Sequence, residues 1–346
     1  MKKVRLGFIG CGEHSTRDLF PIIPKISNLE LVAVCDRNKE KAMRNAKLFG
    51  ASKYYTNYEE LLEKEDVEAT MIVGPPKMHT EIGMACLDHG LHIFVEKPSA
   101  STVECAKKLA EKADEVGKFG QVGHFMRHSD AHQLAKKIIN SEEFGVPILF
   151  NCKYFSNGPW EPRNKWGISD LDWTYMLVQG IHLIDISRFF MGEIISLNAK
   201  RHVSGSGRIS FSVATRFDSD ALGLLSFTSS SPNWQSRVEI IGDRGSYLNV
   251  ENAMTLSYEQ AKSWSKKYNF NEPILSQNWE GGTSYKSRPS FGYYGEIEHF
   301  VNSILNNKPP TPNLWDEYKA LLIASAIIED TNTGKSFKFQ TGFLAE

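Results

Sequence analysis

A glycine-rich turn near the start of the chain is the first group of residues that could carry chemistry. Gly10, Gly12 and Ser15 occupy the first, third and sixth positions of a segment that directly follows an apolar, β-branched run. The first glycine permits a tight turn, the second lets the backbone approach a pyrophosphate, and a small third residue lets a helix pack on the strand. We therefore expect this turn, which includes Glu13 and His14, to bind the pyrophosphate of a dinucleotide on its backbone amides.

An acidic residue ends the next apolar run, which is where a dinucleotide fingerprint places its acid. The carboxylate of Asp36 could accept hydrogen bonds from both adenosine ribose hydroxyls and would repel a 2′-phosphate, which favours NAD. Arg37 favours the opposite choice because a guanidinium can pair with that phosphate, so NADP stays open. The alternative for Asp36 is that it only caps the helix expected to begin at Asn38.

Two further residues could handle the proton of an alcohol that is oxidised by a nicotinamide. Lys97, in the tripeptide Glu96-Lys97-Pro98, ends a predicted strand, where its ammonium could stabilise a developing alkoxide. We predict a cis peptide bond before Pro98. His182 is a candidate proton acceptor because histidine side chains in general titrate near neutral pH, and Asp185 would share its helical face. The alternatives are a solvated lysine before a turn and a histidine that only packs in the core.

The elements that position these residues begin with alternating strands and helices. Short β-branched runs predict buried strands, and helix-like segments that end at glycines lie between them. The strands are Val4–Ile9, Leu29–Cys35, Thr70–Val73, Leu91–Val95 and Phe119–Val122; the helices are Asn38–Phe49, Thr80–Asp88 and Ser101–Val116. This alternation predicts an α/β fold, with a doubly wound parallel sheet in an N-terminal Rossmann domain of residues 1–122.

The rhythm changes in residues 123–346, which we assign to a second α/β domain. Strand-like runs between residues 194 and 256 predict a mostly antiparallel sheet. The other expected elements are helices at Ser129–Asn140, Trp173–Met191, Tyr294–Leu305 and Leu314–Asp330, a strand at Pro147–Tyr154 and an irregular loop over 156–172. The last helix, 314–330, could pack back on the first domain.

Composition narrows the classes of partner. The 346 residues suggest about two domains, and 40 basic against 41 acidic residues give a net charge of −1, so no charge-driven binding of nucleic acid or membrane is expected. We find no membrane-spanning segment. The five cysteines form no CxxC pair, so we predict neither disulfides nor a metal site, and a reducing cytoplasm fits.

Several motifs together resemble the Gfo/Idh/MocA family of NAD(P)-dependent sugar and cyclitol oxidoreductases. They occur in the family's order along nearly the whole chain: the Gly10–Gly12 turn, a Pro-x-x-His loop at 74–79, the Glu96-Lys97-Pro98 tripeptide, a Gly-x-His-x-x-Asp helix at 180–185, a sheet turn at 241–246 and a C-terminal helix over 324–334. The tripeptide and the Gly-x-His-x-x-Asp helix in this order are specific, although neither would be alone.

The resemblance implies a Rossmann domain and a C-terminal α/β domain with a large open sheet, through which homodimers or homotetramers often form. It implies reversible oxidation of a secondary alcohol on a sugar, cyclitol or related small molecule, with Lys97, His182 and Asp185 as catalytic residues. It extends the cofactor site to Pro75, Pro76, His79, Glu96, Lys97, Pro98 and Arg127. Two alternatives stay open, an NADPH-preferring keto-sugar or aldehyde reductase and a catalytically silent nucleotide-sensing protein.

The sequence departs from the family at Val178, where many members have an aspartate one helical turn before the histidine. Asp170, Asp172 or Gln179 could substitute for it. This departure is one reason why the reductase alternative stays open.

The loop before the Gly-x-His-x-x-Asp helix supplies candidate substrate contacts. Trp160 and Trp166 could stack on a pyranose ring, and Arg163 could bind a carboxylate or phosphate. Lys97 and His182 complete the expected substrate site. The alternative is that these tryptophans pack the domain boundary, which we favour for Trp173.

Overall fold

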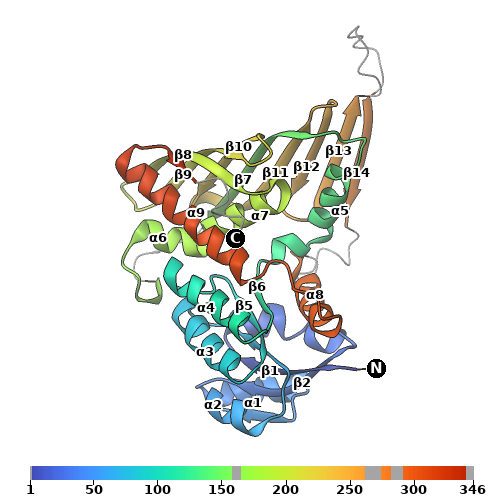
Figure 1. Cartoon of the computed structure of the whole chain (residues 1–346), viewed down its shortest axis with the longest axis vertical. Coiled ribbons are helices and arrows are strands. Elements are labelled where there is room, and N and C mark those ends of the chain that lie inside the picture. Colours follow the sequence, from blue (N-terminus) through green and yellow to red (C-terminus); the bar gives the residue numbers. More distant parts are fainter. Residues whose placement is uncertain (1, 158–164, 262–273, 282–290, 340–346) are drawn as a thin grey trace. The chain divides into compact units, whose positions relative to one another are not determined.

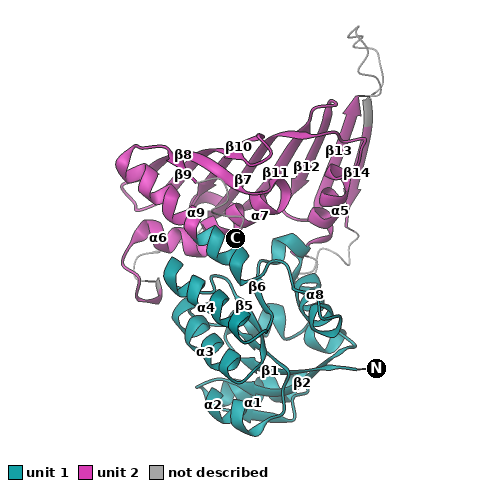
Figure 2. Ribbon diagram, in the orientation of Figure 1, with its two compact units in different colours: residues 1–128, 292–321 teal, residues 129–291, 322–346 magenta. Residues whose placement is uncertain are grey.

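The computed structural model describes residues 2–157, 165–261, 274–281 and 291–339 (Figure 1). The chain divides into two compact units, one of residues 1–128 and 292–321 and one of residues 129–291 and 322–346 (Figure 2). This division differs from the predicted boundary at 122/123 in two ways. The first unit continues to His128, and a later segment, 292–321, returns to it.

The first unit contains a six-stranded sheet with the order β3-β2-β1-β4-β5-β6, in which all paired neighbours are parallel. The strands are β1 (Val4–Ile9), β2 (Leu29–Cys35), β3 (Lys53–Tyr55), β4 (Ala69–Ile72), β5 (His92–Glu96) and β6 (Gly120–Gly123). This is the strand order of the doubly wound dinucleotide-binding fold, so the predicted Rossmann domain is confirmed. The three-residue strand β3 was too short to predict.

The helices of this unit begin and end where local chemistry requires. They are α1 (Lys39–Phe49), α2 (Tyr58–Lys64), α3 (Pro76–Asp88), α4 (Val103–Glu115) and α8 (Tyr293–Leu305). The Asn38 side chain caps α1 by accepting a hydrogen bond from the Lys41 amide, and Gly50 ends it at φ 84°. Helix α3 begins earlier than predicted, because Pro76 suits the first helical position, where no amide hydrogen is needed.

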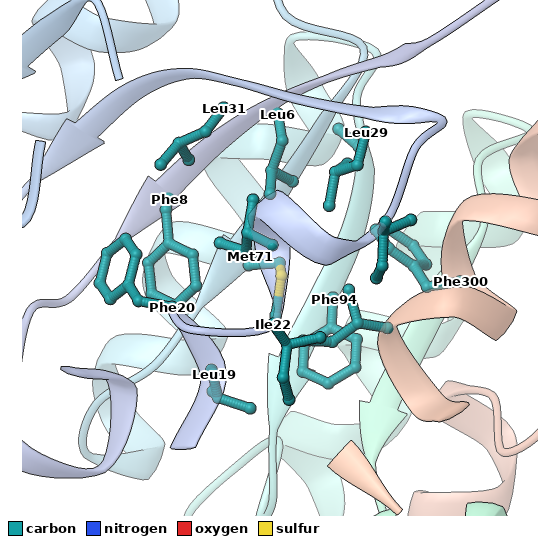
Figure 3. Packing of buried hydrophobic residues seen from close by; sticks show 14 of the residues in the cluster. Leu6, Phe8, Leu19, Phe20, Ile22, Leu29, Leu31, Met71, Phe94 and Phe300 are labelled. Atoms are coloured by element: carbon teal, nitrogen blue, oxygen red, sulfur yellow. The ribbon is translucent and has the colours of Figure 1, made fainter. Parts of the chain in front are cut away.

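Two apolar clusters cover the two faces of this sheet. One joins Leu6 and Phe8 of β1, Met71 of β4 and Phe94 of β5 to Phe300 of α8 (Figure 3). The other contains Ile93 and Val95, which alternate with Phe94 along β5, and packs against α2, α3 and α4. The segment 292–321 therefore belongs to the first unit because α8 buries its apolar face in the first cluster.

The second unit contains a nine-stranded sheet with the order β14-β13-β12-β11-β7-β10-β9-β8-β15. The strands are β7 (Pro147–Asn157), β8 (Ile194–Val203), β9 (Ile209–Phe217), β10 (Leu222–Thr228), β11 (Ser230–Gly242), β12 (Ser246–Glu251), β13 (Thr255–Ala261), β14 (Ile274–Glu280) and β15 (Phe337–Lys338). Within the described strands of this second sheet, only β7 and β10 pair in parallel. The predicted large, mostly antiparallel sheet is confirmed.

Helices α5 (Asp130–Ile139) and α7 (Ile181–Met191) pack on this sheet, α7 on β7 and α5 on β12 and β13 (Figure 1). The helix predicted over Trp173–Met191 is present, but it begins at Leu171 and contains a π-helical turn. The segment forms α6 (Leu171–Tyr175), a π-helical turn (Met176–Gly180) and then α7. The Met176 side chain uses the space that Gly180 leaves, since a Cβ on Gly180 would lie 2.5 Å from the Met176 sulfur.

The last long helix, α9 (Leu314–Thr333), belongs to the first unit as far as Leu321. Its predicted start at Leu314 is confirmed, and so is a helix at 294–305, which is α8. Within the ranges described, none of the helices has the length and apolar character needed to cross a membrane.

Candidate functional site

The glycine-rich turn lies where the strand order of the first sheet reverses, between the carboxyl ends of β1 and β4. Gly10 follows β1 with φ +104°, and a Cβ at this position would lie 1.9 Å from the carbonyl oxygen of Val73, which follows β4. Only glycine fits a position with this backbone conformation and this neighbour. The turn therefore lies at the point of a doubly wound sheet where ligands bind.

The backbone at Gly12 has open space beside it. No heavy atom lies within 4 Å of where its Cβ would be. A cavity of about 290 Å³ adjoins the turn, and its lining includes the cations Lys41 and Arg44 together with Arg17, which pairs with the lining residue Glu13 at 2.8 Å. Ser15, the third small residue of the turn, is fully buried. Space, exposed backbone and positive charge at the turn fit the pyrophosphate of a dinucleotide.

Asp36 follows β2 and faces the turn. Its Oδ2 accepts a hydrogen bond from the Cys11 amide at 2.7 Å, and its Oδ1 accepts one from the Asn38 amide at 2.8 Å. Asn38, rather than Asp36, caps α1, so the alternative role for Asp36 is wrong. An ionised carboxylate has about four acceptor sites, so both oxygens can still accept from ribose hydroxyls. Arg37 is exposed beside it.

His14 bridges two buried carboxylates. Its Nδ1 lies 2.9 Å from Asp18 Oδ2, and its Nε2 lies 3.2 Å from Glu96 Oε1. Burial opposes protonation, but the two carboxylates outweigh it and raise the pKa of His14 to about 9. His14 is therefore an imidazolium at neutral pH and places a fixed positive charge in the nucleotide turn. No feature of the sequence pointed to this contact between residues 14 and 96.

Glu96, at the end of β5, is held in its ionised form. Burial opposes ionisation, but the charge of His14 lowers the pKa of Glu96. Glu96 packs against β6 at Gly123, where a Cβ would lie 2.9 Å from Glu96 Oε1. Glu296 of α8 is fully buried, and burial together with the Glu96 carboxylate raises the pKa of Glu296 well above its usual range. The charge of His14 thus favours the ionised form of Glu96, whereas burial favours the protonated form of Glu296.

Lys97 directly follows β5 and is partly exposed, at the carboxyl edge of the sheet. Its amide donates a hydrogen bond to Glu96 Oε2 at 3.1 Å. The Lys97–Pro98 peptide bond is cis, as predicted. Lys97 and the nucleotide turn therefore occupy the same edge of the parallel sheet, where ligands bind in this fold.

The other predicted cofactor residues of this unit differ in accessibility. Pro75 is exposed, whereas Pro76 and His79 are buried in α3. Both ring nitrogens of His79 lie within hydrogen-bond distance of backbone groups, the Gly74 amide and the Pro98 carbonyl. Arg127 is buried, and its guanidinium lies 3.5 Å from the Asp316 carboxylate.

In the second unit, His182 lies in the first turn of α7 and is 5% exposed. Its ring stacks on Tyr154 of β7, with centroids 5.3 Å apart and planes 10° apart. Burial raises the pKa of Tyr154 to about 12, against an opposing hydrogen bond with Trp234, so the phenol stays neutral. Asp185 is buried one turn after His182 on the same helix.

Trp234 contacts the same aromatic group and was not predicted from the sequence. It makes an edge-to-face contact with Tyr154 at 6.0 Å and with Phe291 at 5.8 Å. It lies where β11 bulges against β7, since the register shifts between Ser230 and Gln235. Pro232 within an otherwise strand-like run was the available signal, because proline in a strand marks a bulge or an edge.

Val178 lies in the π-helical turn that precedes α7. Of its possible substitutes, Asp170 accepts the Trp173 amide as the cap of α6, and Asp172 pairs with Arg201 at 2.7 Å. Gln179 Oε1 is buried and has no hydrogen-bond partner among the residues that the structure describes. Of the three candidates to replace the family aspartate, Gln179, three residues before His182, is therefore the one whose side-chain oxygen could still accept a hydrogen bond.

The loop predicted over 156–172, with its candidate substrate contacts, lies only partly within the described residues. Trp160 and Arg163 lie outside the described residues. Trp166 is half-buried in a 3₁₀ turn (Lys165–Gly167), with a left-handed φ of 56°. Trp173 is half-buried on α6. The predicted cofactor residues thus gather in the first unit, and His182 lies with Asp185, Tyr154 and Trp234 in the second.

Known proteins resemble both units. Residues 4–124 match the family model described as an oxidoreductase family with an NAD-binding Rossmann fold, and residues 132–248 match the GFO/IDH/MocA C-terminal domain. An inositol 2-dehydrogenase of Rubrobacter xylanophilus is 26% identical, over 98% of this chain and 94% of its own. A scyllo-inositol 2-dehydrogenase (NAD(+)) of Bacillus subtilis is 28% identical, over 89% and 88%.

Solved structures share the fold. A dehydrogenase from Chromobacterium violaceum superimposes with a TM-score of 0.89 at 19% identity, covering 96% of this chain and 97% of its own. A levoglucosan dehydrogenase, solved with NADH and L-sorbose, superimposes with a TM-score of 0.82 at 20% identity, covering 98% and 100%.

Proposed function

Because the chain belongs to the Gfo/Idh/MocA family of NAD-binding oxidoreductases, we propose that it transfers a hydride between a nicotinamide and a secondary alcohol or ketone of a sugar, cyclitol or sugar derivative. The observation that carries this proposal is the turn at Gly10–Ser15, with Asp36 beside it, at the reversal point of the sheet. NAD, when bound, supplies the hydride acceptor.

The first unit binds and orients the cofactor. The turn amides and the open face of Gly12 hold the pyrophosphate, and Asp36 accepts hydrogen bonds from the adenosine ribose. The His14 imidazolium, fixed between Asp18 and Glu96, offsets the charge of these two buried carboxylates beside the same turn. These roles need no basic surface, which agrees with the near-neutral charge of the chain.

Lys97 and His182 handle the hydroxyl proton. The Lys97 ammonium donates to the substrate oxygen and stabilises the alkoxide as charge develops on it. His182 accepts the proton during oxidation and returns it during reduction. Tyr154, stacked on the imidazole, holds the ring plane, and Asp185 supports it from the next turn of α7.

The relatives support the substrate class. The two dehydrogenases named above act on inositols by their names, and the structural relative on levoglucosan, so the shared chemistry is a ring carbon bearing a secondary hydroxyl. In this chain, the partly exposed ring of Trp234 suits the C–H face of such a ring. Gln179, in place of the family aspartate, can donate to and accept from ring hydroxyls without adding a charge.

A panel of cyclitols, aldoses, ketoses and their oxidised forms, followed by nicotinamide absorbance, tests this function. We expect turnover of at least one ring alcohol with NAD, and a loss of about a hundredfold or more in Lys97→Met and in His182→Ala. Turnover by none of the compounds with either nucleotide, while NAD still binds, would reject the activity. Unchanged rates in both variants would reject the assigned residues.

A second candidate is an NADPH-preferring reductase. Lys41 and Arg44 line the cavity beside the turn, and Arg37 is exposed next to Asp36. These cations could accept a 2′-phosphate. Measured Kd values for NADH and NADPH decide between the candidates, since tighter binding of NADH rejects the reductase.

We also propose that the protein self-associates through the open face of its second sheet. The open face of this sheet carries Leu222 and Leu224 of β10, which are 50% and 45% exposed, and Leu222 pairs with Leu149 of the neighbouring strand β7. A second copy would cover this face. All five cysteines are free thiols, which is compatible with a site of action in the reducing cytoplasm.

A further inference from the structure

The buried ring of His79 connects the loops that follow two neighbouring strands. The Gly74 amide, after β4, donates to His79 Nε2 at 2.7 Å, and His79 Nδ1 lies 2.8 Å from the Pro98 carbonyl oxygen, after β5. An amide can only donate, so Nε2 is the unprotonated nitrogen and Nδ1 carries the hydrogen that is donated to Pro98. Burial lowers the pKa of His79, which keeps the ring in this neutral form.

A second set of side chains holds the next residue of the same loop. The Thr80 hydroxyl, one position along α3, donates to the Ser99 carbonyl at 3.2 Å. The Ser99 amide donates to Glu317 Oε1 at 3.0 Å, and the other oxygen of Glu317 bonds to the ring of His124, which follows β6. Ser99, His124 and Glu317 are all at most 1% exposed.

Lys97 therefore lies between two fixed points. On one side its own amide is bonded to Glu96, whose carboxylate is held by His14. On the other side the carbonyls of Pro98 and Ser99 are held by the first turn of α3, which begins four residues after β4 ends. Lys97 itself is partly exposed, and it lies in a backbone segment whose polar groups are anchored.

We propose that His79 is a positioning residue, which fixes the Lys97-Pro98-Ser99 backbone so that the Lys97 ammonium meets the substrate oxygen. This inference rests on the proposed function. It replaces the direct contact with cofactor that family resemblance implied for His79, because both ring nitrogens are used by the backbone and the side chain is fully buried. Catalytic groups lose rate steeply when they move by about an ångström, so the anchoring should appear in kcat.

The test compares two substitutions at this position. His79→Phe keeps the ring and removes both hydrogen bonds, whereas the amide of His79→Gln can accept from Gly74 and donate to Pro98. We expect kcat to fall about tenfold to a hundredfold in His79→Phe, with KM and the NAD Kd within about threefold of wild type, and to recover most of its value in His79→Gln. Thr80→Val, a milder change on α3 that removes the hydrogen bond to the Ser99 carbonyl, should fold and should lower kcat by a smaller factor than His79→Phe does.

His92→Phe is the matched control. His92 begins β5, at the opposite end from Lys97, and its Nδ1 also accepts a backbone amide, that of Phe119, at 3.0 Å. This variant loses a comparable hydrogen bond and should keep the wild-type kcat. Equal losses in His92→Phe and His79→Phe, or no rescue by His79→Gln, would show a general structural role and overturn the inference.

A readout without substrate separates this inference from the proposed activity. In ¹⁵N spectra of the unliganded protein, we expect His79 to show the neutral Nδ1–H tautomer, and the Gly74 amide to exchange faster in His79→Phe. The Nε2–H tautomer would overturn the inference whether or not the protein oxidises sugars. Wild-type kcat in folded His79→Phe and Thr80→Val, alongside an inactive Lys97→Met, would overturn it while leaving the proposed function intact.

Discussion

A Cβ on Gly10 would lie 1.9 Å from the carbonyl oxygen of Val73, so the exits of β1 and β4 approach each other more closely than any other residue type allows. Gly12, two positions later, has no atom within 4 Å of its Cβ position. The two glycines of this motif thus have different roles. Gly10 is needed by the fold, and Gly12 is needed by the ligand.

This difference predicts opposite results for two alanine variants. Gly10→Ala should destabilise the protein by at least about 2 kcal/mol, because it combines the clash with a left-handed φ. Gly12→Ala should fold with wild-type stability and bind NAD at least about tenfold more weakly, since a methyl group would occupy the space for the pyrophosphate. Chemical denaturation and nucleotide titration measure the two effects. Wild-type affinity in Gly12→Ala would contradict the placement of the cofactor.

The His14 imidazolium predicts a pH-dependent contribution to stability. The pKa of His14 is raised from 6.5 to about 9 in the folded protein, so its stabilising effect is complete below pH 6.5 and is lost as pH rises to about 9. The difference in melting temperature between wild type and His14→Gln should shrink across that window. Asp18→Asn removes one of the two carboxylates that raise the pKa of His14. The pH range over which this stabilisation is lost should therefore end at a lower pH. A constant difference from pH 6 to 10 would exclude the charged form.

Asp36 should set the preference between the two nucleotides. Asp36→Asn removes the charge that repels a 2′-phosphate and leaves Arg37 in place, so the ratio of NADP to NAD affinity should rise at least about tenfold. Fluorescence titration with both nucleotides measures it. Glu30→Gln removes an exposed carboxylate from the same strand and should leave the ratio unchanged. Parallel changes in the two affinities would mean that Asp36 does not discriminate between them.

Leu222 and Leu224 should control self-association. Replacing both with lysine places two charges on the open face of the sheet, and light scattering should then report a smaller assembly than for wild type. Leu48→Lys is the control, because Leu48 is 63% exposed on α1 of the first unit. If the double variant keeps the mass of wild type, copies of the chain do not associate through this face.

The sequence predicted the strands of the first unit well, because buried parallel strands are continuous apolar runs and the helices between them end at glycines. It missed the π-helical turn before His182, since the amphipathic pattern of 173–191 is that of one continuous helix. It predicted that the helix beginning at Leu314 could pack back on the first domain, but it missed that residues 292–313, with α8, also return to the first unit. The apolar face of α8 is visible in the sequence, but the sheet that receives it is not.

In the candidate site, too, some features were predictable from the sequence and others were not. Gly10, Asp36 and Lys97 were predictable because each follows a strand that the sequence marks clearly. The links between loops were not predictable, because they join residues far apart in the chain, as in His14 with Glu96 and His79 with Pro98. Such contacts follow from strand order and helix packing, which no local pattern encodes.

The most direct test of the account is the rate of nicotinamide reduction by Lys97→Met, at saturating NAD and with the best substrate of the panel, with the NAD Kd measured on the same sample. We expect kcat to fall by about a hundredfold to ten-thousandfold while the NAD Kd stays within about threefold of wild type. A wild-type kcat, or a loss of activity explained entirely by lost NAD binding, would contradict the account.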